Sequence, residues 1–162
     1  MKIILDAGHG IDTPGKCSPD GLFREYKWCR EMATLVKELL EGEGYDVTYI
    51  CEGVEKDTKL GTRVNMVNKL CSKYGTNNCV LISIHNDAAG SDGKWHTASG
   101  WSVRVSLNAS NNSKKLAQKL LDEAIKADVM GNRSIPKCGY WAQNLYICKN
   151  VKCPAVLIEN MF

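Results

Sequence analysis

Apolar and polar residues follow one another along this chain in a pattern of short strands separated by amphipathic helices. Runs typical of strands cover residues 2–6, 47–51, 80–84, 101–107 and 155–158. Apolar residues at helical spacing predict helices over 22–43, 58–75 and 111–125. We expect irregular structure over 88–99 and 131–144, and a short strand over 145–148. Strands that alternate with helices predict a single α/β domain, in which a twisted, mostly parallel sheet is flanked by helices on both faces.

Charge and hydropathy narrow the classes of partner. The 162 residues carry a net charge of +3, and the lysines and arginines are scattered, so we expect no nucleic-acid partner. No apolar run approaches the roughly 20 residues that cross a bilayer, so we expect no membrane insertion. The first strand runs directly into Asp6, without the apolar core of a signal peptide. We therefore expect a protein that is made in the cytoplasm. We also expect it to be a monomer.

The chain contains eight cysteines, and none of them forms a C-x-x-C pair. Cys29 and Cys71 lie in helical patterns, where cysteine acts as a small apolar side chain of the core. Without a secretion signal, free thiols are the expected state. The alternative is one disulfide, formed after release from the cell, among Cys138, Cys148 and Cys153.

A histidine stands directly after each of two buried strand runs. His9 lies between two glycines in the segment DAGHG at 6–10, and His85 follows the run 80–84. Because the carboxyl ends of parallel strands share one edge of a sheet, where α/β proteins bind ligands, we expect the two imidazoles to meet there. Catalytic zinc takes three protein ligands and keeps one position open. The two histidines therefore indicate part of a metal site.

Sequence position alone does not identify the third ligand, since Asp6, Asp12, Asp20 and Glu25 all lie near His9 in the sequence. Glu25 opens the first long helix after a loop that contains glycine and proline, so the helix start is free to fold back over the strand end. The alternative is that Glu25 only complements the helix dipole, which favours acidic residues in a first turn. The remaining histidine, His96, lies in a polar loop, where we favour a substrate contact over a metal ligand.

Glu159 follows the last buried strand and belongs to the same edge of the sheet. One interpretation is a general base that takes a proton from zinc-bound water and passes it to a leaving amine. The other is an edge carboxylate in a salt bridge, and spacing alone favours neither. Arg63, in the second helix, is expected to hold structure rather than substrate.

Four segments resemble the zinc-dependent N-acetylmuramoyl-L-alanine amidases of the type 3 class, which are bacterial and phage cell-wall enzymes. They are IILDAGHG at 3–10, LFRE at 22–25, LGTRVN at 60–65 with LISIHNDA at 81–88, and CPAVLIEN at 153–160. The resemblance implies that His9, Glu25 and His85 bind Zn²⁺ and that Glu159 is the catalytic base. It also implies hydrolysis of the amide bond between N-acetylmuramic acid and L-alanine in peptidoglycan.

The chain departs from this family pattern in two places. Asn86-Asp87 replaces a small residue and asparagine, and the chain ends three residues after Glu159, where family members usually continue into a helix. We expect residues 1–162 to be the amidase catalytic domain, with that C-terminal helix missing or dispensable.

The lack of a wall-binding repeat and of a signal resembles a compact phage or prophage endolysin, which reaches the cell wall after release or lysis. The alternatives are a zinc peptidase that acts on the stem peptides of peptidoglycan and a non-catalytic wall-binding module.

Overall fold

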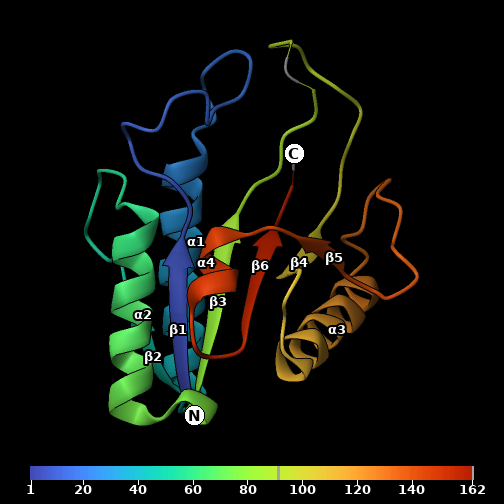
Figure 1. The fold of residues 1–162 in the computed structure, drawn as a ribbon. Coiled ribbons are helices and arrows are strands. Elements are labelled where there is room, and N and C mark those ends of the chain that lie inside the picture. Colours follow the sequence, from blue (N-terminus) through green and yellow to red (C-terminus); the bar gives the residue numbers. More distant parts are fainter. Residues whose placement is uncertain (91, 162) are drawn as a thin grey trace.

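The computed structural model describes residues 1–90 and 92–161, so position 91 of the expected loop and the last residue of the expected domain lie outside the described residues. One sheet has the order β2-β1-β3-β6-β4-β5 (Figure 1). Its strands are β1 (Lys2–Ala7), β2 (Asp46–Tyr49), β3 (Cys79–His85), β4 (Ser102–Ser106), β5 (Trp141–Gln143) and β6 (Ala155–Glu159). The helices are α1 (Glu25–Gly42), α2 (Leu60–Tyr74), α3 (Asn111–Lys126) and α4 (Tyr146–Asn150), with a 3₁₀ turn, η1 (Thr76–Asn78). The predicted α/β domain is confirmed.

The first four strands of the sheet order, β2, β1, β3 and β6, run parallel. β4 runs antiparallel to β6, and β5 runs parallel to β4. The carboxyl ends of β1, β3 and β6 therefore lie at one edge, where His85 pairs in register with Glu159. The chain leaves β1 toward β2 and later returns to β3 on the other side of β1. Such a switch point is where open α/β sheets bind ligands.

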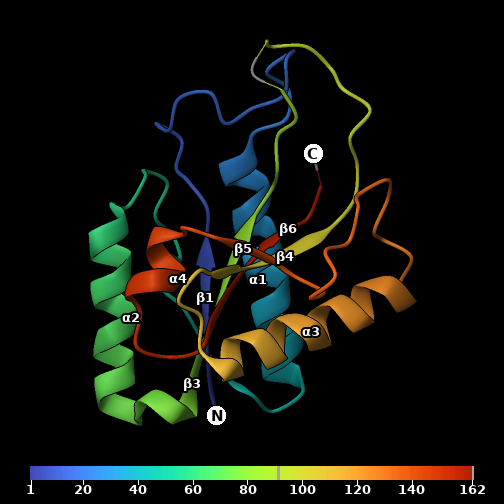
Figure 2. The ribbon, with the colours of Figure 1, turned by 45° about the vertical axis from the view of Figure 1, so that its right-hand side comes forward.

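Helices cover both faces of the sheet, as predicted (Figure 2). α2 and α4 pack on the face that carries Ile4 and Leu81, whereas α1 packs on the face of Leu5 and Val80. α3 packs on the same face as α1, against β4 and Val156 of β6. Burial on both faces explains why these strands read as continuous apolar runs. In the described part of the chain, no helix combines the length and apolar character that crossing a bilayer requires.

The first long helix begins at Glu25, three residues after its predicted start. Cys17 and Arg24 form an isolated β-bridge, and the Ser18 hydroxyl accepts a hydrogen bond of 2.9 Å from the Phe23 amide. These contacts close residues 17–24 into a tight loop, because polar side chains such as serine offer the backbone an alternative to helical bonds. The loop places Glu25 at the carboxyl end of β1.

Two short elements differ from the prediction. Residues 145–148 were expected as a strand, but α4 begins at Tyr146, and both Ile147 and Cys148 are buried against α2. A run of four apolar residues has no periodicity that separates a helix from a strand, so packing decides. The segment 131–144, expected to be irregular, contains β5, which pairs with β4 at the sheet edge.

All eight cysteines are free thiols in the structure, including the trio for which a disulfide was the alternative. Cys29 and Cys71 lie in the core, as expected, whereas Cys17 and Cys138 are exposed. Burial raises the pKa of Cys148 to about 12, so this thiol is protonated and unreactive at neutral pH.

Candidate metal centre

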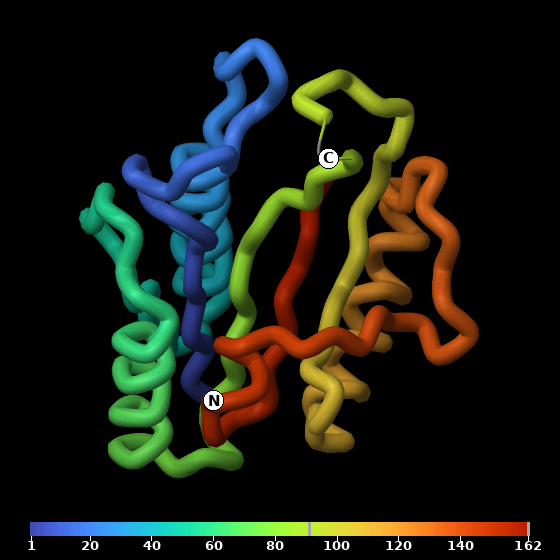
Figure 3. Tube along the Cα trace, turned by 45° about the horizontal axis from the view of Figure 1, so that its top comes forward, coloured from blue at the N-terminus to red at the C-terminus, as the bar shows by residue number. Residues whose placement is uncertain are grey.

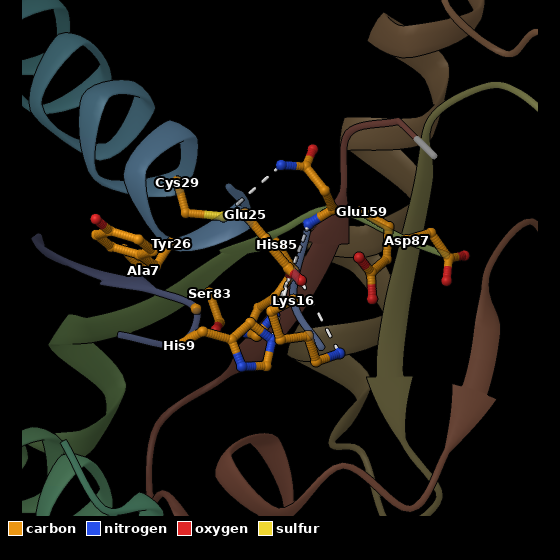
Figure 4. A network of polar contacts seen from close by, with 12 residues as sticks. Ala7, His9, Lys16, Glu25, Tyr26, Cys29, Ser83, His85, Asp87 and Glu159 are labelled. Atoms are coloured by element: carbon orange, nitrogen blue, oxygen red, sulfur yellow. Dashed lines mark hydrogen bonds and ion pairs between the residues drawn. The ribbon is translucent and has the colours of Figure 1, made fainter. Parts of the chain in front are cut away.

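The three residues that the resemblance assigned to the metal lie together at the carboxyl edge of the sheet (Figure 4). Glu25 Oε1 is 3.3 Å from His9 Nε2 and 3.3 Å from His85 Nδ1. One ligand atom from each side chain lies within 4.8 Å of the other two. The imidazole rings meet edge to face, with centroids 5.0 Å apart. In the described part of the chain, no other set of histidine, cysteine and acidic side chains meets this geometry.

The donor set fits a catalytic zinc ion. Two imidazoles and one carboxylate leave a fourth tetrahedral position open, and ligand atoms at about 2.0–2.1 Å from the ion stand roughly 3.4 Å apart. Burial acts to raise the pKa of Glu25, but hydrogen bonds from His85, His9 and the Asn86 amide hold the pKa well below its ordinary value. Glu25 is therefore ionised, which is the form that binds a metal.

The other acidic residues near His9 are engaged elsewhere. The acceptor atoms of Asp6, Asp12 and Asp20 take hydrogen bonds from the Arg63 guanidinium (2.6 Å), the Asp57 amide (2.6 Å) and the Ser18 hydroxyl (2.5 Å). The tertiary structure thus separates these three candidates from the histidine pair and brings only Glu25 to it.

The backbone at the end of β1 is bent sharply enough to turn His9 toward the site. His9 has a φ of 61°, in the left-handed region that residues other than glycine rarely adopt. Gly10 is required beside it, since a Cβ there would lie 2.0 Å from the Asp57 amide nitrogen. Strained backbone of this kind costs about 1–3 kcal/mol and clusters at functional sites.

Gly8 provides the space for the second histidine. A Cβ on Gly8 would lie 2.5 Å from His85 Nδ1, the atom that faces Glu25. Gly8→Ala should displace the His85 ring and weaken zinc binding roughly 10- to 100-fold, the range that misplaced ligand orientation costs. Competition titration with a chelating dye measures this. The matched control is Gly42→Ala, because a Cβ on Gly42 meets nothing within 4 Å. Equal zinc affinity in both variants would contradict the prediction.

Arg63 holds the strand end that carries His9. Its side chain is 2% exposed and donates to Asp6 Oδ1 (2.6 Å), the Ala7 carbonyl, the His9 carbonyl (3.2 Å) and Asp57 Oδ1 (2.9 Å). These contacts tie α2 to β1. Arg63 therefore acts as scaffold for the site, in line with the role expected for it.

Glu159 lies next to the candidate metal ligands with one oxygen unused. It is 9% exposed, and its Oε2 is buried without a hydrogen-bond partner in the described part of the chain. Burial raises the pKa of Glu159 to about 7, although the neighbouring charges of His85 and Arg104 act to lower it. A carboxyl group that titrates near neutrality beside a metal site suits proton transfer. The contact with Arg104, at 3.9 Å from Nε to Oε1, is longer than a hydrogen bond.

A cavity of about 640 Å³ adjoins Glu25. Residues 15–19 and 23 line one wall, and residues 86–90, 93–96 and 98 line the other. The backbone of these two walls faces across the space above the sheet edge (Figure 3). Trp95 on the second wall is 68% exposed and offers a flat apolar surface. His96 also lines this wall, where its Nε2 contacts Asp92 Oδ1 at 2.9 Å rather than the candidate metal ligands.

The sequence analysis did not predict the charged residues that lie near Glu159 in space. Arg104 of β4 and Arg133 both contact Asp87 Oδ2. The one available signal was Arg104 itself, the only charged residue in the run 101–107.

Comparison with known proteins gives one family. The model of the family described as Amidase_3, N-acetylmuramoyl-L-alanine amidase, matches residues 3–162. No curated protein matches the chain.

Solved structures show the same fold. An N-acetylmuramoyl-L-alanine amidase from Clostridium difficile 630 is 23% identical, with a TM-score of 0.81 over 99% of this chain and 79% of that one. The amidase Ami1 from Mycobacterium smegmatis is 18% identical, with a TM-score of 0.80 and coverages of 99% and 82%. The catalytic domain of CwlV from Bacillus (Paenibacillus) polymyxa var. colistinus is 21% identical, with a TM-score of 0.74 and coverages of 99% and 79%.

Proposed function

The chain belongs to the Amidase_3 family of N-acetylmuramoyl-L-alanine amidases, which act on peptidoglycan, and we propose that His9, Glu25 and His85 hold its zinc ion while Glu159 is the general base. The observation that carries this assignment is the convergence of three ligand atoms within 4.8 Å, beside the Glu159 carboxylate, whose Oε2 has no hydrogen-bond partner in the described residues. Residues 1–162 act as the catalytic domain in this proposal.

The side chains divide the reaction between them. A zinc ion at this site supplies Lewis acidity toward the scissile carbonyl and lowers the pKa of water. Glu159 Oε2 accepts the proton of the attacking water as the new carbon–oxygen bond forms on the N-acetylmuramoyl carbonyl. Because burial places the pKa of Glu159 at about 7, the same group can return that proton to the L-alanine nitrogen as the carbon–nitrogen bond breaks. Water is consumed, and no other reactant is needed.

Removal of the metal should abolish activity, and added zinc should restore it. We expect purified peptidoglycan treated with the holoenzyme to gain free L-alanine amino termini, without new reducing sugar ends, as end-group analysis measures. Cleavage within the stem peptide would instead support the zinc peptidase, and zinc binding without any cleavage would support the wall-binding module.

Zinc stoichiometry tests the ligand assignment separately from activity. His9→Ala should lose most of the bound zinc, because the variant lacks one of three ligands. His96→Ala is the matched control, since His96 pairs with Asp92 outside the triad, and it should retain one zinc ion per chain. If His9→Ala keeps full stoichiometry, the assignment of His9 is wrong.

We further propose that the protein is a monomeric endolysin, made in the cytoplasm and released to the cell wall. The cysteines support this role: all eight are free and most are buried, as is typical of proteins that fold in a reducing compartment. Producing cells should keep their turbidity until chloroform opens the membrane, and then clear. Clearing that requires attachment of an export signal, with none after chloroform, would overturn the endolysin role.

A further inference from the structure

Arg104 lies beside Glu159 with one hydrogen-bond donor unused. Its Nε is 3.9 Å from Glu159 Oε1, and this nitrogen is buried without a hydrogen-bond partner in the part of the chain that the structure describes. We propose that Arg104 is a positioning residue, whose Nε–H binds Glu159 Oε1 during the reaction and turns Oε2 toward the attacking water. This proposal rests on the proposed role of Glu159 as the base.

The reversed direction of β4 brings Arg104 to this place. Ser102 pairs directly with Glu159, and Arg104 pairs with Leu157, two residues earlier on β6. Directly paired residues of antiparallel strands point to the same face, and a long side chain reaches the diagonal neighbour. The Arg104 guanidinium therefore lies diagonally across from the Glu159 carboxylate.

Two further contacts hold Arg104 in this orientation. Arg104 Nη1 donates to Gln143 Oε1 at 2.9 Å, and Nη2 pairs with Asp87 Oδ2. Asp87 is itself fixed, because its Oδ1 accepts a hydrogen bond of 2.9 Å from the Ala88 amide. A planar guanidinium anchored at two nitrogens has its third N–H direction set. The nitrogen that carries this third N–H lies 3.9 Å from Glu159 Oε1. Asp87, one of the departures from the family pattern, thus supports the base through Arg104.

The 3.9 Å separation of Arg104 Nε and Glu159 Oε1 also indicates that these two residues do more than stabilise the edge of the sheet. An ion pair that only stabilised the fold would close to hydrogen-bond distance, since each buried polar atom without a partner costs about 1–3 kcal/mol. Instead neither Arg104 Nε nor Glu159 Oε2 has a hydrogen-bond partner among the residues that the structure describes. A shift of roughly 1 Å closes the gap between Nε and Oε1 to a normal hydrogen bond.

The test compares two arginines that bind the same carboxylate. Arg133 Nη2 contacts Asp87 Oδ2 at 3.0 Å and the Gly100 carbonyl at 3.3 Å. Arg133→Gln therefore removes an equal charge from Asp87 and leaves the Arg104 Nε opposite Glu159. On solubilised peptidoglycan fragments, Arg104→Gln should lower kcat roughly 10- to 100-fold with little change in KM, because a misplacement of about 1 Å can cost about 100-fold. Arg133→Gln should keep kcat within about threefold of wild type.

A double-variant cycle separates a role through Glu159 from general damage. In a Glu159→Gln background, Arg104→Gln should reduce kcat less than about twofold further, because the group that it positions is already gone. The same pair should also show non-additive changes in thermal unfolding of the metal-free protein, a readout that needs neither zinc nor substrate. Zinc stoichiometry should match wild type in both arginine variants.

Several outcomes would overturn the proposal. These are equal kcat values for Arg104→Gln and Arg133→Gln, or additive effects in the cycle. If Arg104→Gln does not fold, Arg104→Lys carries the same test, since lysine keeps the charge without the directed Nε–H, and wild-type kcat in that variant would overturn the positioning role. If Glu159→Gln itself keeps full activity, the base assignment fails, which is a different result.

Discussion

Glu159→Gln is expected to lower kcat by roughly 100- to 10,000-fold, the range that a general base contributes. Glutamine preserves the shape of the side chain but cannot accept the proton of the attacking water. Zinc stoichiometry should remain at the wild-type value, because Glu159 is not one of the three converging ligands. Release of free L-alanine amino termini from peptidoglycan measures the activity. Glu52→Gln, at an exposed pair with Lys37, is the isosteric control and should keep wild-type turnover.

The same variant should become relatively more stable as the pH rises. Folding raises the pKa of Glu159 from 4.5 to about 7, so the contribution of this group to stability is fully present below pH 4.5 and is lost as the pH rises through about 7. Glutamine has no such loss. Between pH 4 and pH 8, the free energy of unfolding should therefore shift in favour of the variant by on the order of 3 kcal/mol. Urea unfolding of the chelator-treated proteins measures it, and a difference that stays constant with pH would contradict the prediction.

Arg63→Met should destabilise the protein by about 3–5 kcal/mol, the cost of breaking a buried ion pair by removing one partner. Among the described residues, the variant leaves the buried Asp6 carboxylate with the Ser83 hydroxyl at 2.6 Å as its side-chain donor, and it removes the Arg63 donor from the carbonyls of Ala7 and His9. The free energy of unfolding in urea is the measurement. Zinc binding should weaken as well, because His9 loses its support.

Arg30→Met is the matched control for Arg63. Arg30 also donates to the His9 carbonyl, at 2.9 Å, but it is only half-buried, and its Nε contacts the exposed Val54 carbonyl. Its removal should cost about 2 kcal/mol, less than the loss of Arg63, because its hydrogen bonds are part-exposed and each contributes only about 0.5–1.5 kcal/mol net. Similar losses for both variants would show that burial of the Asp6 pair does not set the stability of this strand end.

The central strands of the sheet were predictable from the sequence, whereas the start of one helix and the identity of another were not. The apolar runs predicted β1, β3 and β6 to within one residue or so of their ends, because strands buried on both faces require continuous apolar residues. The strand-end positions of His9, His85 and Glu159 followed from those runs. The start of α1 and the identity of α4 did not, because polar loop contacts and packing against α2 settled them.

The sequence by itself determined the fold class, the edge of the sheet that carries chemistry and, through the family resemblance, the three candidate ligands and the base. Only the tertiary structure decided which acidic residues are engaged elsewhere and that Gly8 provides the space for His85. It also decided that Arg104 lies between Asp87 and Glu159 and contacts both. The physical reason is the distance along the chain over which each kind of interaction acts. Hydrophobic periodicity is a local property of the chain, whereas the partner of a buried charge depends on strand order and direction, and here the reversal of β4 brings Arg104 to the base.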